Sequence, residues 1–197
     1  MLSTLFDETP TSTRLRSYLA EAASSAGIPL SEPEVKAYPD AVYYNYYRLG
    51  ISLLFIPSTG RAKTPLDYET LRLDGIDIYN TLKDAKSSKG KTYSQFPLLP
   101  LELSASPAEP NSDSQTPEFL ILKAGTTGED FVRVLGEPTR KGGGAGPSAG
   151  SISIWCEWSK LGIMVEFGGD EARGPQAWER GKDAAWKVVT LFPPKDP

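Results

Sequence analysis

The sequence contains one thirteen-residue pattern twice, and this duplication constrains the fold more than any other feature. The first copy runs from Tyr43 to Phe55 and the second from Trp155 to Phe167, at a constant offset of 112 positions. Aromatic residues align with aromatic residues, Arg48 with Lys160, and Leu-Gly-Ile with Leu-Gly-Ile. We therefore expect the chain to contain two copies of one folding unit.

Each copy predicts two strands joined by a tight turn. The residues after each turn alternate with the period of two that is typical of strands. The apolar members of this alternation are Ile51, Leu53 and Phe55 in the first copy and Ile163, Val165 and Phe167 in the second. Gly50 and Gly162 would supply the bend, because glycine takes backbone angles that a β-carbon penalises.

The first copy has a helix before its hairpin and a strand after it. Ser12 or Thr13 can cap a helix over residues 14–25, which Gly27 ends. A strand-like run starts at Val35, and residues 71–79 predict another strand with a bulge at Gly75.

The second copy has the same kinds of element around its hairpin. Residues 119–122 predict a strand, and Thr126 with Glu129 has capping-box spacing at the start of a helix that Gly136 ends. Residues 186–192 predict the last strand.

These elements predict an α+β fold of two tandem helix-plus-antiparallel-meander repeats, with the helices on one face of the sheet or sheets. The first αβ repeat covers residues 1–82 and the second covers residues 118–197. Between them, residues 83–117 form a flexible linker rich in Lys, Ser and Pro, since such a composition buries little apolar surface. Within it, the apolar run 96–101 predicts an extended segment that pins the linker to the core.

Composition limits the partners that a chain of this kind can have. The net charge is −4 and the isoelectric point is near 5.0, which argues against a general nucleic-acid binder.

Cys156 is the only cysteine, so no internal disulfide forms and a reducing compartment fits best. No stretch reaches the ~20 apolar residues of a membrane span, and the start has no signal-like segment. We expect a cytoplasmic protein.

Catalytic and metal chemistry find little support in the residue types. The chain has no histidine, which excludes Ser-His and Cys-His nucleophiles and imidazole zinc sites. Cys156 lies on a predicted strand and is interpreted as a small buried apolar residue. We expect no catalytic residues, no cofactor and no metal site, and enzymatic activity is the less favoured alternative.

The first functional hypothesis is a protein-interaction or adaptor module that uses an aromatic sheet face. Neighbouring residues of a strand point to opposite faces, so the tyrosines of residues 43–47 cannot all enter one core. Tyrosine and tryptophan on a rigid sheet are favoured anchors for protein partners. The predicted partner-binding residues are Tyr43, Tyr44, Tyr46, Trp155 and Trp158. The alternative is that loops or the other copy cover them; the sequence leaves the partner and the oligomeric state open.

The second hypothesis is a small-molecule or carbohydrate site, with hydrolysis as one outcome, centred on the polar loop of residues 168–183. Carboxylates there could act as bases or hard-metal ligands, the arginines could hold an anion, and tryptophan could stack on a sugar. The candidate residues are Glu157, Asp170, Glu171, Arg173, Trp178 and Arg180. The simpler interpretation is a loop held by its own Asp/Glu to Arg pairs.

Two short motifs resemble known families. Residues 125–138, followed by a Trp-rich strand and Gly-Ile-x-Val-x-Phe, resemble the repeat of β-lactamase inhibitory proteins and of small SmpA/OmlA-type outer-membrane lipoproteins. That resemblance implies helices packed on one face of a small antiparallel sheet, although the missing lipoprotein signal removes the outer-membrane role. Residues 44–55 resemble the Tyr-Asn-Tyr-Phe-x-Leu-Gly-x-Asp-x-Leu-Phe signature of the phagosome assembly factor family, with Ser52 where that family tends to have an acid. The second resemblance implies a non-catalytic partner protein in autophagy.

Overall fold

The protein divides into two compact units, each of which combines helices with antiparallel strands. The computed structural model describes residues 2–81, 91–105, 119–144 and 152–195. Of these, the first unit contains residues 2–79, 91–98 and 190–193, and the second unit contains the remainder. The predicted α+β class is confirmed.

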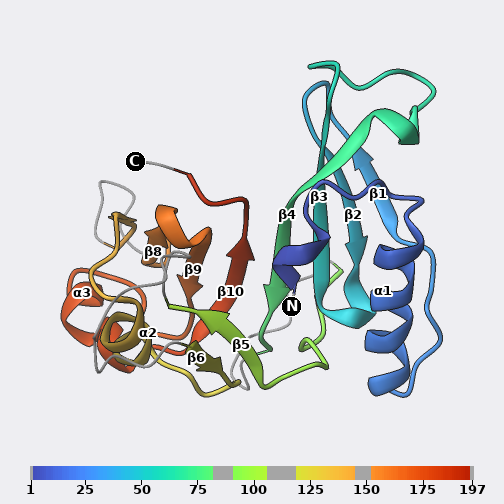
Figure 1. Ribbon diagram of the computed structural model, residues 1–197. Coiled ribbons are helices and arrows are strands. Elements are labelled where there is room, and N and C mark those ends of the chain that lie inside the picture. The colour runs from blue at the N-terminus through green and yellow to red at the C-terminus, as the bar shows by residue number, and fades with distance from the viewer. Residues whose placement is uncertain (1, 82–90, 106–118, 145–151, 196–197) are drawn as a thin grey trace, which may run out of the picture. The chain divides into compact units, whose positions relative to one another are not determined.

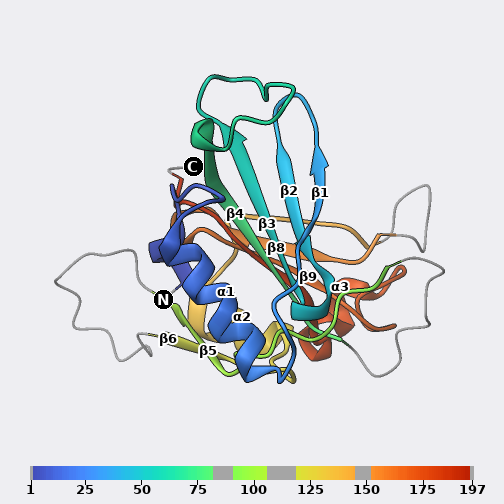
Figure 2. The ribbon, with the colours of Figure 1, turned by 90° about the vertical axis from the view of Figure 1, so that its right-hand side faces the viewer.

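The first unit is a four-stranded antiparallel meander with a helix against one face (Figures 1 and 2). Its elements are η1 (Leu2–Leu5), α1 (Thr13–Ser25), β1 (Glu34–Ala37), β2 (Val42–Tyr46), η2 (Tyr47–Leu49), β3 (Ile51–Pro57), η3 (Tyr68–Thr70) and β4 (Leu71–Tyr79). The strands follow the order β1-β2-β3-β4. The predicted helix and its cap are confirmed, because Ser12 Oγ accepts a hydrogen bond from the backbone N–H of Leu15.

The core of the first unit lies between α1 and the sheet. Leu15 and Leu19 of α1 are buried, as are the alternate residues of the strands. Cross-strand pairs such as Tyr44 with Leu53 place these side chains on one face. The predicted bulge is present beside Gly75: the register between β3 and β4 shifts there and leaves Asp74 as the extra residue.

The second unit has its own antiparallel strands in the order β10-β9-β8-β7, and a separate two-stranded sheet of β5 and β6. Its elements are β5 (Leu101–Ser104), β6 (Phe119–Leu122), α2 (Gly128–Leu135), β7 (Arg140–Gly142), β8 (Trp155–Trp158), η4 (Ser159–Leu161), β9 (Ile163–Phe167), α3 (Ala177–Arg180), η5 (Gly181–Asp183) and β10 (Trp186–Leu191), of which β10 belongs to this unit up to Val189. Phe131 of α2 packs against Trp158 and Phe167 of the sheet, at ring-centroid distances of 6.1 and 5.9 Å.

The capping box of α2 lies one residue later than predicted. Thr127 and Asp130 form it, and not Thr126 and Glu129. The hydroxyl of Thr126 instead accepts a hydrogen bond from the backbone N–H of Lys123 at 2.8 Å. This bond closes the turn after β6, so the following threonine is the one left to cap the helix.

The described part of the predicted linker is packed against the units. Residues 82–90 and 106–118 lie outside the described residues, so most of the predicted linker of residues 83–117 cannot be compared with the structure. Between them, the backbone N–H groups of Ser94 and Phe96 donate to the carbonyl oxygens of Tyr47 and Tyr79. Phe96 is buried, and residues 101–104 form β5. Residues 91–97 are called the strap below.

Candidate functional site on the open face of the first unit

Both hairpins turn in the same way. A 3-10 segment is followed by a left-handed glycine, with φ and ψ of 60° and 35° at Gly50 and of 65° and 37° at Gly162. Each glycine N–H donates to the carbonyl of the first residue of the segment, Tyr47 or Ser159, at 3.2 Å. The predicted glycine turns are confirmed. At Gly50 the strap adds a second constraint, because a β-carbon there would overlap the carbonyl oxygen of Ser94.

The alternation of β2 decides which tyrosines could meet a partner. Tyr44 is only 8% exposed and packs edge-on against Phe55, with ring centroids 5.0 Å apart. Tyr46 lies on the same face and is partly buried. Burial raises the pKa of each of these two phenols to about 12. Tyr43 lies on the opposite, open face, so one of the three tyrosines proposed to bind a partner is placed there.

The tryptophans of β8 divide in the same manner. Trp158 is 3% exposed, and its indole N–H donates to the carbonyl of Gly136 at 2.9 Å. Trp155 lies on the opposite face and is half-buried. Tyr44 and Trp158 therefore belong to the cores of their units and offer no surface to a partner, which corrects that part of the expected aromatic face.

An apolar patch covers one end of the open face of the first unit. We call Tyr38, Tyr43, Leu54 and Ile56 the open apolar patch. The rings of Tyr38 and Tyr43 meet edge-on at 6.0 Å, and Tyr43 is the cross-strand partner of Leu54. Ile56 follows Leu54 on the same side of β3. Tyr38 is 52% exposed and Ile56 is 39% exposed, so the patch is contiguous and open to solvent.

The other end of the same face is polar and fully bonded. Asn45 is buried, and its side-chain N–H donates to the carbonyl of Glu34 at 3.1 Å. Its side-chain oxygen accepts from Ser52 at 2.9 Å and from Tyr93 of the strap at 2.6 Å. The ring of Tyr93 stacks on Tyr79 with centroids 3.6 Å apart. These contacts fix the strap on the face and satisfy each polar atom of Asn45.

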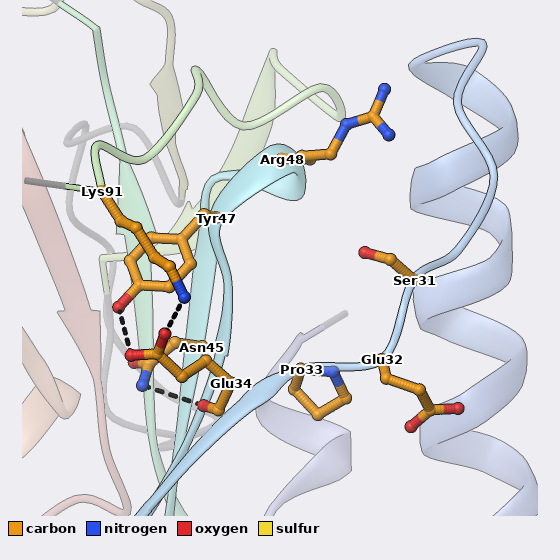
Figure 3. Close-up of a pocket in the computed structure, with 8 residues that line it drawn as sticks. All are labelled: Ser31, Glu32, Pro33, Glu34, Asn45, Tyr47, Arg48 and Lys91. Atoms are coloured by element: carbon orange, nitrogen blue, oxygen red, sulfur yellow. Dashed lines mark hydrogen bonds and ion pairs between the residues drawn. The ribbon is translucent and has the colours of Figure 1, made fainter.

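A pocket of about 380 Å³ opens at this polar end (Figure 3). Its lining residues are Ser31, Glu32, Pro33, Glu34, Asn45, Tyr47, Arg48 and Lys91. Glu34 accepts hydrogen bonds from Lys91 and, at 3.2 Å, from the hydroxyl of Tyr47. The bond from Lys91 is the main reason that the pKa of Glu34 is lowered; partial desolvation opposes the shift, while Lys36 and Tyr47 add to it. The wall formed by Glu34 is therefore ionised and held in place.

The open face of the second unit carries paired charges. Lys187 contacts Glu166 at 2.7 Å, and Arg140 contacts Glu157 at 3.4 Å. Arg140 also lies over the ring of Trp155, 5.9 Å from the centroid. Trp155, the counterpart of Tyr43, thus lies among charged groups.

The residues of the second hypothesis are engaged in several separate contacts. The guanidinium of Arg180 donates to the backbone carbonyls of Asp170 and Arg173, at 2.9 and 3.1 Å. Arg173 donates to Ser153 at 3.3 Å. Trp178 is 43% exposed, with Lys141 above its ring. Backbone carbonyls therefore hold Arg180, in place of the Asp/Glu to Arg pairs expected for this loop.

The carboxylates of that hypothesis do not gather into a metal-binding group. Glu157 accepts from Ser159 at 2.6 Å in addition to its contact with Arg140. Within residues 2–81, 91–105, 119–144 and 152–195, no group of three or more His, Cys, Asp or Glu residues is placed to hold a metal ion. Use of Glu157, Asp170 and Glu171 with a ligand stays a prediction.

Cys156 is buried, as the sequence predicts, on the core face of β8. Burial raises the pKa of its thiol to about 11, which the nearby Lys141 only partly offsets. Its thiol is therefore protonated at neutral pH and weakly nucleophilic.

The sequence carries a signal for one feature of the candidate site and none for another. Ile56 follows Phe55, so placing Phe55 in the core already assigns Ile56 to the open face. The pocket is harder to foresee, since Glu34 and Lys91 are 57 positions apart and meet only because the strap returns.

Comparisons with known proteins returned no match among family models, curated proteins or solved structures. Among the described residues, no helix has both the length and the apolar character needed to cross a membrane.

Proposed function

We propose that the protein is a non-catalytic protein-interaction module whose partner packs against the open apolar patch. One observation carries the proposal: two apolar side chains, Tyr38 and Ile56, are 52% and 39% exposed beside the half-buried Tyr43 and Leu54. Scattered surface apolar residues are ordinary, but a contiguous exposed group marks a contact site.

The chemistry of the patch suits a protein partner. Two tyrosine rings supply large contact area with few rotatable bonds, which limits the entropy lost on binding. Charged residues flank the patch, since Lys36 of β1 lies opposite Tyr43 and Arg72 of β4 lies opposite Ile56 in the strand register. An apolar centre with a polar rim is the usual anatomy of a protein interface. Tyr43 and Leu54 would form the centre.

We further infer that the two units are tandem copies of one helix-plus-meander unit. The matching glycine turns support this, as does the backbone N–H of Lys195, which donates to Ser159 as Ser94 donates to Tyr47. The proposal of tandem units includes a relationship to the β-lactamase inhibitory protein repeat and to the phagosome assembly factor motif, on the residues that resemble them. We also propose a cytoplasmic location, which the single cysteine supports.

The test is affinity capture from an extract of the source organism, with mass spectrometry of the retained proteins. Tyr38→Ser with Ile56→Ser removes two exposed apolar groups from the patch. Ile121→Ser with Trp178→Ser is the matched control, because these side chains of the second unit are 42% and 43% exposed. We expect a partner that the wild type and the control retain and the patch variant loses. Equal recovery by all three folded proteins would reject the proposal.

A further inference from the structure

The charged groups that line the pocket at the polar end of the open face are unevenly engaged: Glu34 and Lys91 are paired with each other, whereas Glu32 and Arg48 are not. One of the pocket's two carboxylates is well engaged, because Glu34 accepts from Lys91 and from Tyr47 and lies 3.4 Å from the ammonium of Lys36. The side-chain nitrogen and oxygen of Asn45 are also hydrogen-bonded. These groups shape the wall and keep little capacity to bind a cationic ligand.

Arg48 is the lining group that has kept its bonding capacity. It is exposed, and it forms no hydrogen bond or ion pair with the described residues. Figure 3 shows its guanidinium extending outward from η2, on the side of the segment that leads to Ser31 and away from Lys91 and Glu34. The hydroxyl of Ser31 is directed into the pocket, and the carboxylate of Glu32 points away from Arg48. Arg48 and Ser31 therefore offer hydrogen-bond donors that have no partner among the described residues, beside one free carboxylate, that of Glu32.

We propose that this pocket binds the oxyanion group of a small molecule, a phosphate or a carboxylate, with Arg48 as the main contact. A guanidinium presents a planar fork of N–H groups that matches either oxyanion in a bidentate way. Ser31 contributes a hydroxyl.

The size of the pocket points to a small organic molecule. Its volume of about 380 Å³ lies at the lower end of the range typical of small-ligand sites, roughly 300–1,000 Å³. Pro33 and the ring of Tyr47 provide apolar surface beside the charged groups. An oxyanion on a short carbon skeleton fits these walls.

The site is also preorganised. Arg48 lies in the 3-10 turn that Gly50 and the strap lock, with Ser94 bonded to Tyr47 at 2.8 Å. Tyr47 packs on Tyr93 of the strap, with ring centroids 4.6 Å apart. A backbone held from both sides lowers the cost of ordering the arginine on binding.

The experiment titrates isotope-labelled full-length protein with three probes and follows backbone amide shifts by NMR. Glycerol 3-phosphate tests a phosphate, lactate tests a carboxylate, and glycerol is the neutral control. We expect at least one anion to give saturable shifts at Ser31, Glu34 and Arg48, and glycerol to give none. Binding of one anion alone identifies the oxyanion, and binding of both supports the shared chemistry.

Two variants decide whether Arg48 is the contact. Arg48→Gln should weaken anion binding about tenfold or more, the size expected for losing hydrogen bonds to a charged group. Arg61→Gln, an exposed arginine of the same unit outside the pocket, should bind like the wild type. Absence of saturable shifts with both anions, shifts centred elsewhere, or equal affinity of wild type and Arg48→Gln would overturn the proposal. The patch variant leaves this site intact, so the two proposals fail independently.

Discussion

The open faces of the two hairpins differ in chemistry although their backbones agree. At aligned positions, Leu54 of the first unit corresponds to Glu166 of the second, and Asn45 corresponds to Glu157. The second face is covered by ion pairs, with Lys187 on Glu166 and Arg140 on Glu157. The first face carries the open apolar patch. One backbone therefore presents either a solvated charged surface or an apolar one.

This difference separates what the fold requires from what it leaves free. The turn requires glycine at positions 50 and 162, where φ is positive, and the core requires apolar residues at every second position of β3 and β9. Exposed ion pairs contribute little to stability, so the second face gains mainly solubility. An exposed apolar group has no such benefit, which is why we propose the contact function for the first unit.

The largest contrast in stability should be between Trp158 and its aligned residue Tyr46. Trp158→Ala removes a buried ring and the hydrogen bond to Gly136, and we expect it to lower the free energy of unfolding by about 3–5 kcal/mol. Tyr46 is only partly buried, so Tyr46→Ala should cost less. Urea denaturation measures both, and a larger loss at Tyr46 would contradict the assigned burial.

A second contrast concerns the strap over the first turn. Gly50→Ala forces a residue with a β-carbon into positive φ and against Ser94, and should cost about 3 kcal/mol or more. Gly60 has positive φ but open space around it, so Gly60→Ala should cost only about 1 kcal/mol. Chemical denaturation would show the difference; equal losses would mean that the strap does not confine the turn.

Substitution of the aligned polar residues Asn45 and Glu157 should also lower the stability by different amounts. Asn45→Ala removes the acceptor of the buried hydroxyl of Ser52 and a hydrogen bond of the partly buried Tyr93, and a buried polar group that loses its partner costs about 1–3 kcal/mol. Glu157→Ala breaks a partly exposed ion pair with Arg140, which is worth about 1 kcal/mol or less, and removes the acceptor of one hydroxyl, that of Ser159, whereas Asn45→Ala removes the acceptor of two hydroxyls and the donor to Glu34. Thermal unfolding of both variants tests this order, and the reverse order would show that the polar network is not the stronger element.

The smallest predicted effect is a pH dependence at Glu34. Its pKa in the folded state lies below the ordinary value of 4.5, mainly because Lys91 donates to it. The associated stabilisation is therefore present above that ordinary value and is lost as the pH falls through the folded pKa. An NMR titration of the Glu34 carboxyl should show a higher pKa in Lys91→Gln and an unchanged one in Lys182→Gln. An unchanged pKa in Lys91→Gln would refute the contact.

Local periodicity was enough to predict much of the fold. Alternation after Gly50 predicts β3, because a strand with one buried face must repeat every second residue. Ser12 and the apolar spacing after it predict α1 in the same way. The cap of α2 was misplaced by one residue because two threonines adjoin, and only the turn at Lys123 decides between them.

The candidate site was less accessible to sequence reasoning. Alternation shows that Tyr43 and Tyr44 take opposite faces, but not which of them is buried; the cross-strand neighbours of Tyr44 decide that. Lys91 was interpreted as part of a flexible linker, because its neighbours in sequence are polar. Its contact with Glu34 depends on Tyr93 and Phe96 fixing the strap, and no local pattern carries that information.

The measurement that tests the central claim most directly is the affinity of the captured partner for a chain in which the two faces are made alike. Leu54→Glu places in the first unit the residue type that the second unit has at position 166. Calorimetry with the purified partner should show binding lost in Leu54→Glu and retained in Glu166→Leu, with both variants folded by circular dichroism. Unchanged affinity of Leu54→Glu would contradict the assignment of the open apolar patch as the contact surface.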